Sequence, residues 1–220
     1  MSTDPAAFPP AYRAVLAIGT PIMERWSRLQ VRGLEHLPPT GPVLLAADHD
    51  SYWDPIAVAV AARRVRPVRA LSKSTLWKTR GVALLMDGMG HIPVERGASN
   101  DAAMDAAEHE LRAGACIGIF PEGTRSLGGV LRARAGLGRL AAAVPEATVV
   151  GCRINGTVDV VRLPRRPRVT VEFLRPAGGG LQPGESPVDF SVRVLAELRA
   201  GAAPEVPGRR RTAAAFRSRL

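Results

Sequence analysis

Short apolar runs alternate with longer segments of mixed polarity along most of the chain. An apolar run bounded by turn residues is typical of a buried strand, and apolar residues that recur with the helical period are typical of a helix that covers a sheet. These patterns predict strands at 42–47, 68–71, 90–94, 116–120, 148–154 and 168–174. They predict helices at 54–64, about 100–113, 137–144 and 187–199. Strands that alternate with helices indicate an α/β fold in which helices cover a mainly parallel sheet.

Residues 1–36 are predicted to form an amphipathic helical segment ahead of a domain at 37–201. Between residues 8 and 30, apolar side chains are interleaved with arginines. This mixture suits a helix that lies among anionic lipid headgroups, and it also suits a helix that packs on the domain. Pro21 should kink or divide this helix, and a short extended piece is expected at 29–33.

The composition is that of a basic, globular chain. Its 220 residues are 46% hydrophobic, which is enough to bury the core of a single domain. Lysine and arginine number 30 against 20 aspartates and glutamates, a formal charge of +10 that implies attraction to polyanions. The end of the chain at 202–220 is predicted to be a basic, disordered tail. Because the few aromatic residues form no stacking platform and no helix-turn-helix pattern is present, we expect no binding to nucleic acid.

The two cysteines and the hydropathy pattern bear on location. Cys116 and Cys152 lie in apolar runs without partners at metal-ligand spacing, so we expect reduced thiols in the core and infer a reducing, cytosolic environment. No apolar run is long enough for a conventional membrane span, and the first residues lack the pattern of a secretory signal. The expected location is therefore peripheral, at the cytoplasmic face of a membrane.

Two polar motifs follow predicted strands. His49-Asp50-Ser51-Tyr52-Trp53-Asp54 comes after the run 43–47, and Phe120-Pro121-Glu122-Gly123-Thr124-Arg125-Ser126 comes after 115–119. Open α/β sheets bind ligands at the carboxyl ends of their strands. His49 and Asp54 are close enough in sequence for the carboxylate to hold the imidazole in one tautomer, as a general base requires. A hydroxyl group is the natural substrate for such a base.

These motifs resemble those of the glycerolipid acyltransferases typified by 1-acylglycerol-3-phosphate acyltransferase. The first signature of that family, His-x4-Asp with a nearby serine, is matched by His49, Ser51 and Asp54. The second is similar to the segment from Gly90 to Arg96, and the third is matched at every position from 120 to 126. The fourth, at 148–152, carries Gly151 where a proline usually stands. The four segments occur in the family order and span about half of the chain.

The resemblance implies transfer of a fatty acyl group from a thioester, acyl-CoA or acyl carrier protein, to the sn-2 hydroxyl of 1-acylglycerol 3-phosphate (lysophosphatidate). The product would be phosphatidate, a step of phospholipid biosynthesis, and no metal or organic cofactor is expected. In this scheme His49 removes the hydroxyl proton and Asp54 stabilises the imidazolium. Arg96 and Arg125 bind the acceptor phosphate, and the other expected partner is an anionic membrane surface.

The remaining motif residues are expected to bind substrate or to support the site. Gly123 allows close backbone approach, Thr124 lies in the same loop, and Glu122 should orient Arg125 or hold the loop. Lys73 follows a predicted strand and adds positive potential. Ser51 is a substrate-binding residue and a less favoured nucleophile, since no nucleophile elbow surrounds it, and we prefer direct transfer. His91 and His109 have no sequence partner that suggests catalysis.

Three alternatives stay open at this point. Asp54 precedes a proline, a common helix opening, so its carboxylate could act as a helix N-cap as well as a histidine partner. The same chemistry could serve another acceptor, such as glycerol 3-phosphate, another lysophospholipid or a specialised alcohol. The chain could also be a catalytically inactive protein that binds anionic membranes, although the intact His-x4-Asp pattern favours an enzyme.

Overall fold

A seven-stranded, mainly parallel sheet forms the centre of the computed structural model, which describes residues 6–95, 100–126, 129, 131–161 and 166–201. Its strands are β1 (Gln30–Arg32), β2 (Val43–Ala47), β3 (Arg69–Lys73), β4 (Ile92–Val94), β5 (Cys116–Ile119), β6 (Thr148–Asn155) and β7 (Thr170–Leu174). Their order across the sheet is β1-β7-β6-β2-β5-β3-β4. The pair β6 and β7 is antiparallel and the other neighbouring pairs are parallel, so the predicted α/β class is confirmed.

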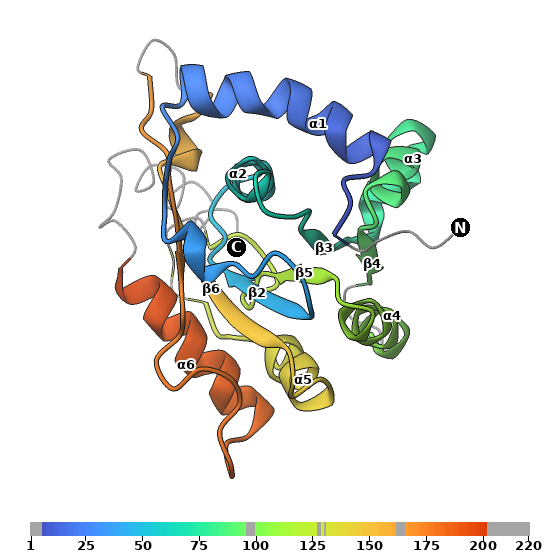
Figure 1. Cartoon of the computed structure of the whole chain (residues 1–220), viewed down its shortest axis with the longest axis vertical. Helices are drawn as coiled ribbons and strands as arrows, with labels where there is room; N and C mark the ends of the chain where they lie inside the picture. Colours follow the sequence, from blue (N-terminus) through green and yellow to red (C-terminus); the bar gives the residue numbers. More distant parts are fainter. Residues whose placement is uncertain (1–5, 96–99, 127–128, 130, 162–165, 202–220) are drawn as a thin grey trace, which may run out of the picture.

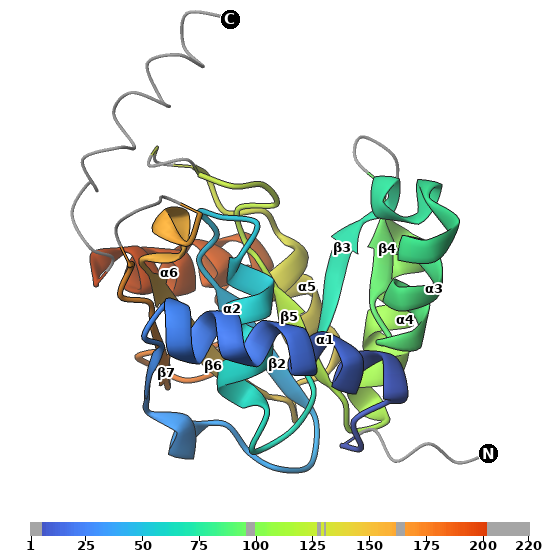
Figure 2. The ribbon, with the colours of Figure 1, turned by 90° about the horizontal axis from the view of Figure 1, so that it is seen from above.

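Helices cover both faces of this sheet. They are α1 (Pro10–Pro21), α2 (Asp54–Ala62), α3 (Arg80–Gly88), α4 (Asp101–Arg112), α5 (Gly136–Ala143) and α6 (Pro187–Ala200). Figure 1 shows α4, α5 and α6 on one face, and α2 on the opposite face with α1 outside it. In Figure 2, α1 crosses in front of α2 and reaches α3, which lies beside the edge strand β4. In the part of the chain that the structure describes, no helix has both the length and the apolar character needed to span a bilayer.

Alternation along the central strand β2 explains why its whole run is apolar. Val43, Leu45 and Ala47 pack in the core cluster that includes α2, whereas Leu44 and Ala46 pack in the cluster that includes α4, α5 and α6. All five residues are buried, as expected for a parallel strand covered on both faces. The flanking strands β5 and β6 carry the two cysteines, which are free and buried in the core as predicted.

The N-terminal helix packs on the domain. Tyr12 and Met23 are fully buried, and the Tyr12 hydroxyl donates to the carbonyl oxygen of Val68 at 3.3 Å and accepts from its N–H at 3.1 Å. Helix α1 ends at Pro21, and a π-helical turn at Ile22–Trp26 follows, so the proline divides the segment as predicted. Much of the apolar surface that could enter lipid is therefore used within the fold.

One short element confirms the sequence expectation, and one segment was not predicted. The extended piece expected at 29–33 forms β1, which pairs with β7 at the edge of the sheet, so the sheet begins before residue 37. The segment between β3 and β4 contains a 3-10 turn at Ser74–Lys78 and helix α3, neither of which the sequence pattern predicts. The basic tail at 202–220 lies outside the described residues.

Candidate active site

The two motif loops meet at the carboxyl ends of the neighbouring strands β2 and β5. The loop at 48–53 follows β2, and the loop at 120–126 follows β5. The N–H of His49 donates to the Glu122 carboxylate at 2.9 Å, and the N–H of Ser126 donates to the His49 carbonyl oxygen at 2.8 Å. Because the strands run parallel, the sheet brings two segments that are about 70 residues apart in sequence to one edge.

His49 and Asp54 form the pair that the sequence predicted. The distance between His49 Nδ1 and Asp54 Oδ2 is 2.9 Å. The same Asp54 oxygen accepts from the N–H groups of Asp50 at 2.6 Å and Ser51 at 2.7 Å, and its other oxygen accepts from the Thr157 hydroxyl. Because this oxygen accepts from every group around it, the neutral imidazole places its proton on Nδ1, toward Asp54, and its lone pair on Nε2.

The His49 imidazole is fixed in position by its neighbours and is still accessible from solvent. Its ring stacks on Phe120 with 4.1 Å between the ring centroids, and 16% of the His49 side chain is exposed. Helix α2 begins at Asp54 itself and has no side-chain cap, so the expectation that Asp54 caps this helix is wrong. Its carboxylate faces back to the preceding loop, because the N–H groups of that loop need an acceptor.

A partly buried arginine, which the sequence did not point to, joins the two loops from the last turn of α6. Arg199 Nη1 lies 3.1 Å from Asp50 Oδ2 and 3.6 Å from Asp48 Oδ2. Its Nε and Nη2 lie 3.0 and 2.5 Å from Glu122 Oε1, and Nη2 lies 3.4 Å from the His49 carbonyl oxygen. Arg199 therefore connects three carboxylates to the backbone that carries His49.

Burial controls the charge of this cluster. It raises the pKa of Asp48 to about 7, against the charge of Arg199, which lowers it. It also raises the pKa of Glu122, while the charge of Arg199 again acts in the opposite direction. Burial on its own would lower the pKa of Arg199, but the charges of Asp50 and Glu122 raise it overall. The guanidinium thus stays charged and stabilises the carboxylates around it.

The residues predicted in the second loop have separate positions. Of the two roles expected for Glu122, the structure shows the one that holds the loop, since its carboxylate accepts from the His49 N–H and from Arg199. The Arg125 guanidinium lies over the ring of Tyr52, 3.5 Å from its centroid, where both side chains reach solvent. Gly123 is exposed with φ of 65°, a left-handed conformation that favours glycine, and Thr124 beside it is half-buried.

Three further residues were predicted to belong to the site, and they have different positions. The Ser51 hydroxyl is buried, donates to the Thr157 carbonyl oxygen at 3.2 Å and accepts from the Trp53 N–H at 3.2 Å, so it supports the loop. Lys73 is exposed at the end of β3, in register with Val94 of β4. Arg96 lies outside the described residues. In the described part of the chain, no group of three or more histidine, cysteine and acidic side chains is placed to hold a metal ion.

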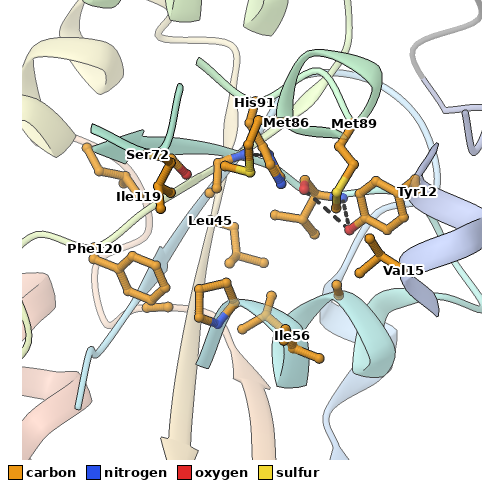
Figure 3. Close-up of a pocket in the computed structure, with 18 of the residues that line it drawn as sticks. Tyr12, Val15, Leu45, Ile56, Ser72, Met86, Met89, His91, Ile119 and Phe120 are labelled. Carbon is orange, nitrogen blue, oxygen red and sulfur yellow. Dashed lines mark hydrogen bonds between the residues drawn. The ribbon is translucent and has the colours of Figure 1, made fainter. Parts of the chain in front are cut away.

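An apolar cavity of about 260 Å³ lies beside the imidazole, under α1, α2 and α3 (Figure 3). Phe120, which stacks on His49, also lines this cavity, and Tyr12 and Met89 lie at the opposite end. Among the lining residues His91 is neutral, because burial lowers its pKa to about 4, and its Nδ1 accepts from the Ala70 N–H at 2.9 Å. His91, which the sequence left without a role, is thus a wall residue of the cavity.

The family model described as Acyltransferase matches residues 28–155, which is more than half of the chain. The chain belongs to the acyltransferase family. The matched segment contains both motif loops and the His49–Asp54 pair, whereas Arg199 lies beyond it. The resemblance drawn from the motifs is therefore confirmed.

Curated relatives and a solved structure agree with this assignment. The chain is 34% identical over 109 residues to the 1-acyl-sn-glycerol-3-phosphate acyltransferase of Borreliella burgdorferi, covering 48% of this chain and 42% of the relative. It is 31% identical over 107 residues to the mouse 1-acyl-sn-glycerol-3-phosphate acyltransferase alpha, covering 46% of this chain and 36% of the relative. The chain thus spans about two fifths of these relatives.

The fold resembles that of the crystal structure of 1-acyl-sn-glycerophosphate acyltransferase, PlsC, from Thermotoga maritima. The TM-score is 0.65 at 20% sequence identity, covering 86% of this chain and 78% of that chain. At this identity the likeness concerns the arrangement of the sheet and helices. It shows that the acyltransferase architecture extends beyond the segment that the family model matches.

Proposed function

We propose that the chain is an O-acyltransferase that moves a fatty acyl group from a thioester to the sn-2 hydroxyl of 1-acylglycerol 3-phosphate. The observation that carries this proposal is the His49–Asp54 pair next to an apolar cavity, with one aromatic ring between them. Two relatives named as 1-acyl-sn-glycerol-3-phosphate acyltransferases support the choice of acceptor.

In the proposed reaction His49 acts as a general base. Asp54 accepts a hydrogen bond from Nδ1, so Nε2 is the atom that takes the proton of the acceptor hydroxyl. As this proton leaves, the hydroxyl oxygen attacks the thioester carbonyl carbon. The carbon–sulfur bond then breaks, and the leaving thiolate takes the proton back from the imidazolium. A positioned base of this kind contributes roughly 100- to 10,000-fold to the rate. Because the Ser51 hydroxyl is engaged by the loop backbone, direct transfer without an acyl-enzyme is the simpler route.

The cavity is the proposed binding site for the acyl chain of the donor. Its walls are almost entirely apolar, and each buried methylene group contributes about 0.8 kcal/mol to binding. An acyl chain that runs from the Phe120 end toward Tyr12 would leave its thioester carbonyl near Phe120, whose ring stacks on His49. This position is where the base is needed.

The acceptor phosphate is proposed to bind cationic side chains at the same edge of the sheet. Arg125 and Lys73 are the described candidates, and Arg96 is the third member of the set. Arginine presents a planar fork that matches phosphate oxygens, whereas lysine acts as a point charge. The donor carrier is coenzyme A or acyl carrier protein, and the protein acts at a membrane surface because its acceptor is a lipid.

The test is an acyl-transfer assay of the purified protein with every combination of two donors and three acceptors. Palmitoyl-CoA and palmitoyl-acyl carrier protein are each combined with lysophosphatidate, glycerol 3-phosphate and lysophosphatidylcholine. We expect the fastest transfer to lysophosphatidate and its loss in His49→Ala. No transfer with any pair, or equal transfer by the wild type and His49→Ala, would overturn the proposal. A clear preference for glycerol 3-phosphate would keep the chemistry and change the acceptor.

A further inference from the structure

A short turn after strand β6 brings one more hydroxyl group to the His49–Asp54 pair. This 3-10 turn, at Thr157–Asp159, begins directly after Gly156. Gly156 has φ of 83°, a left-handed conformation that favours glycine, and a Cβ there would collide with the carbonyl oxygen of Arg168. Because β6 lies next to β2 and runs parallel to it, Thr157 reaches the loop that carries His49.

Thr157 contacts this loop through two atoms. Its hydroxyl donates to Asp54 Oδ1, and its carbonyl oxygen accepts from the Ser51 hydroxyl at 3.2 Å. Thr157 and Asp54 are each only 1% exposed, so neither group is open to water. A single residue from β6 therefore holds both the carboxylate and the serine of the first motif.

The two oxygens of the Asp54 carboxylate have different partners. Oδ2 faces the His49 imidazole and two N–H groups of the loop. Among the residues that the structure describes, the donor to Oδ1 is the Thr157 hydroxyl. A buried carboxylate oxygen that loses its donor is costly, and the carboxylate then rotates or shifts to find another. The hydroxyl thus sets the plane of the carboxylate, and with it the direction from Oδ2 to the imidazole.

The turn is itself anchored in the fold. The indole N–H of Trp26 donates to the carbonyl oxygen of Val160 at 2.8 Å, and the N–H of Val160 donates to the Thr157 carbonyl oxygen at 3.3 Å. Val160 is buried and belongs to the same core cluster as Met23. This anchoring matters because a residue that orients another must be held in place by its own neighbours.

We propose that Thr157 is a positioning residue for the acyl transfer, the third member of a His49–Asp54–Thr157 chain of hydrogen bonds. The proposal rests on the proposed function, in which Asp54 keeps the proton of the imidazole on Nδ1, and it adds the group that keeps Asp54 in place. Thr157 lies two residues beyond the segment that the family model matches, and it does not line the cavity. Its effect therefore reaches the reaction through Asp54.

The first experiment compares three single substitutions in the full chain. Thr157→Val nearly keeps the shape of the side chain and retains the carbonyl oxygen that holds Ser51, but it removes the hydroxyl. Thr157→Ser keeps the hydroxyl and removes the methyl group. Thr148→Val, at the amino end of the same strand, is the matched control for the loss of a threonine hydroxyl. Thermal melting checks that the variants fold. If Thr157→Val does not fold, Thr157→Cys takes its place, since its thiol is only a weak donor.

Steady-state kinetics with palmitoyl-CoA and lysophosphatidate measure the effect on transfer. Because hydrogen bonds to charged groups are strong, we expect Thr157→Val to lower kcat by about tenfold to a hundredfold and to change the KM of the thioester by less than about twofold. Thr157→Ser should recover most of the turnover, and Thr148→Val should match the wild type. Equal kcat for the wild type and Thr157→Val, or no recovery in Thr157→Ser, would contradict this role.

A second readout needs no substrate. Nitrogen-15 NMR of the histidine-labelled protein at alkaline pH distinguishes an imidazole protonated on Nδ1 from one protonated on Nε2, and His49→Ala identifies the signal among the four histidines. We expect protonation on Nδ1 in the wild type and in Thr157→Ser, and a partial loss of this preference in Thr157→Val. An unchanged signal in Thr157→Val would overturn the proposal. The expected change in a protein that transfers no acyl group to any acceptor would instead reject the proposed function and leave Thr157 as the residue that orients the pair.

Discussion

The two sides of the Phe120 ring differ in almost every physical respect. On the His49 side, charged groups contact one another within hydrogen-bonding distance, and Arg199 joins Asp50 and Glu122. On the other side, the cavity is lined by single apolar side chains contributed by three strands and three helices. The polar region holds the side chains around His49 in fixed positions. The apolar region is a cavity whose length limits the acyl chain that it can bind.

This difference predicts different responses to substitution. A buried ion pair that loses one partner leaves an uncompensated charge, which destabilises a protein by about 3–5 kcal/mol. An apolar wall that gains or loses a methyl group changes packing by a smaller amount and in a graded way. We therefore expect substitutions near His49 to act on the reaction or on folding, and substitutions in the cavity to act on the choice of acyl chain.

The largest expected effect on catalysis is that of His49→Ala. Removing the base should lower kcat by on the order of 100- to 10,000-fold, with little change in the KM of the thioester. The backbone contacts of His49 with Glu122 and Ser126 do not involve the imidazole, so the fold should persist. Steady-state kinetics and a thermal melt of the same preparation check both statements. Retention of most of the wild-type turnover would show that the base lies elsewhere.

The next largest effect is expected for Arg199→Met. Because this change leaves Asp50 and Glu122 without their cation, urea denaturation should show a loss of about 3 kcal/mol in the free energy of unfolding. The charge of Arg199 lowers the pKa values of Asp48 and Glu122, so both values should rise further in this variant. Part of the lost stability should then return as the pH is lowered and these carboxylates take up protons, which the loss of packing alone would not produce.

Arg199→Lys is the matched control for that experiment. It keeps the charge and loses the planar fork that reaches Asp50 and Glu122 together, so it should restore stability more than turnover. Equal stability and identical pH profiles for the wild type, Arg199→Lys and Arg199→Met would remove Arg199 from the account of the site.

A smaller effect concerns the pH dependence of stability. The pKa of Asp48 is about 7 in the folded protein and 3.8 as its ordinary value, so the folded state binds the extra proton between these limits. Stability from this group is fully present below the lower value and is lost as pH rises through the higher one. Asp48→Asn should remove this loss, and its free energy of unfolding relative to the wild type should therefore rise between about pH 4 and pH 7. A constant difference over this range would contradict the assignment.

The polar region around His49 could largely be predicted from the sequence. The apolar run at 42–47 corresponds to β2 at Val43–Ala47, and the helix expected at about 100–113 corresponds to α4 at Asp101–Arg112. Local patterns of this kind, with motifs at strand ends, are enough to place His49 beside Asp54 and Glu122 in the same site. The contact of Glu122 with Arg199 is not local, since 77 residues separate them, and a single arginine in a helix carries no signal of it.

The cavity and α3 could not be predicted for a related reason. The sequence shows which residues are apolar but not which of them leave a space between their side chains. Helix α3 and its C-cap have apolar residues at helical spacing, namely Val82, Leu85, Met86 and Met89. However, the helix is short, has a glycine near each end and buries no residue of its own, so its pattern is a weaker signal than that of a helix packed on the core. Gly151, which replaces the usual proline, lies on the face of β6 toward Leu174 and Leu198. This face is opposite to the one that packs with α2, so the departure concerns α6 packing.

The central claim is that the cluster around His49 carries out the reaction and the apolar cavity binds the acyl chain. The most direct test of this claim is turnover measured as a function of acyl-chain length. Ala59 packs with Tyr12 and Met89, at the end of the cavity away from Phe120, so Ala59→Leu shortens the space available to the chain. We predict that His49→Ala lowers turnover at every length, whereas Ala59→Leu keeps the wild-type rate with short chains and loses it with long ones. An Ala59→Leu profile that coincides with the wild type, or that falls equally at all lengths, would contradict the account.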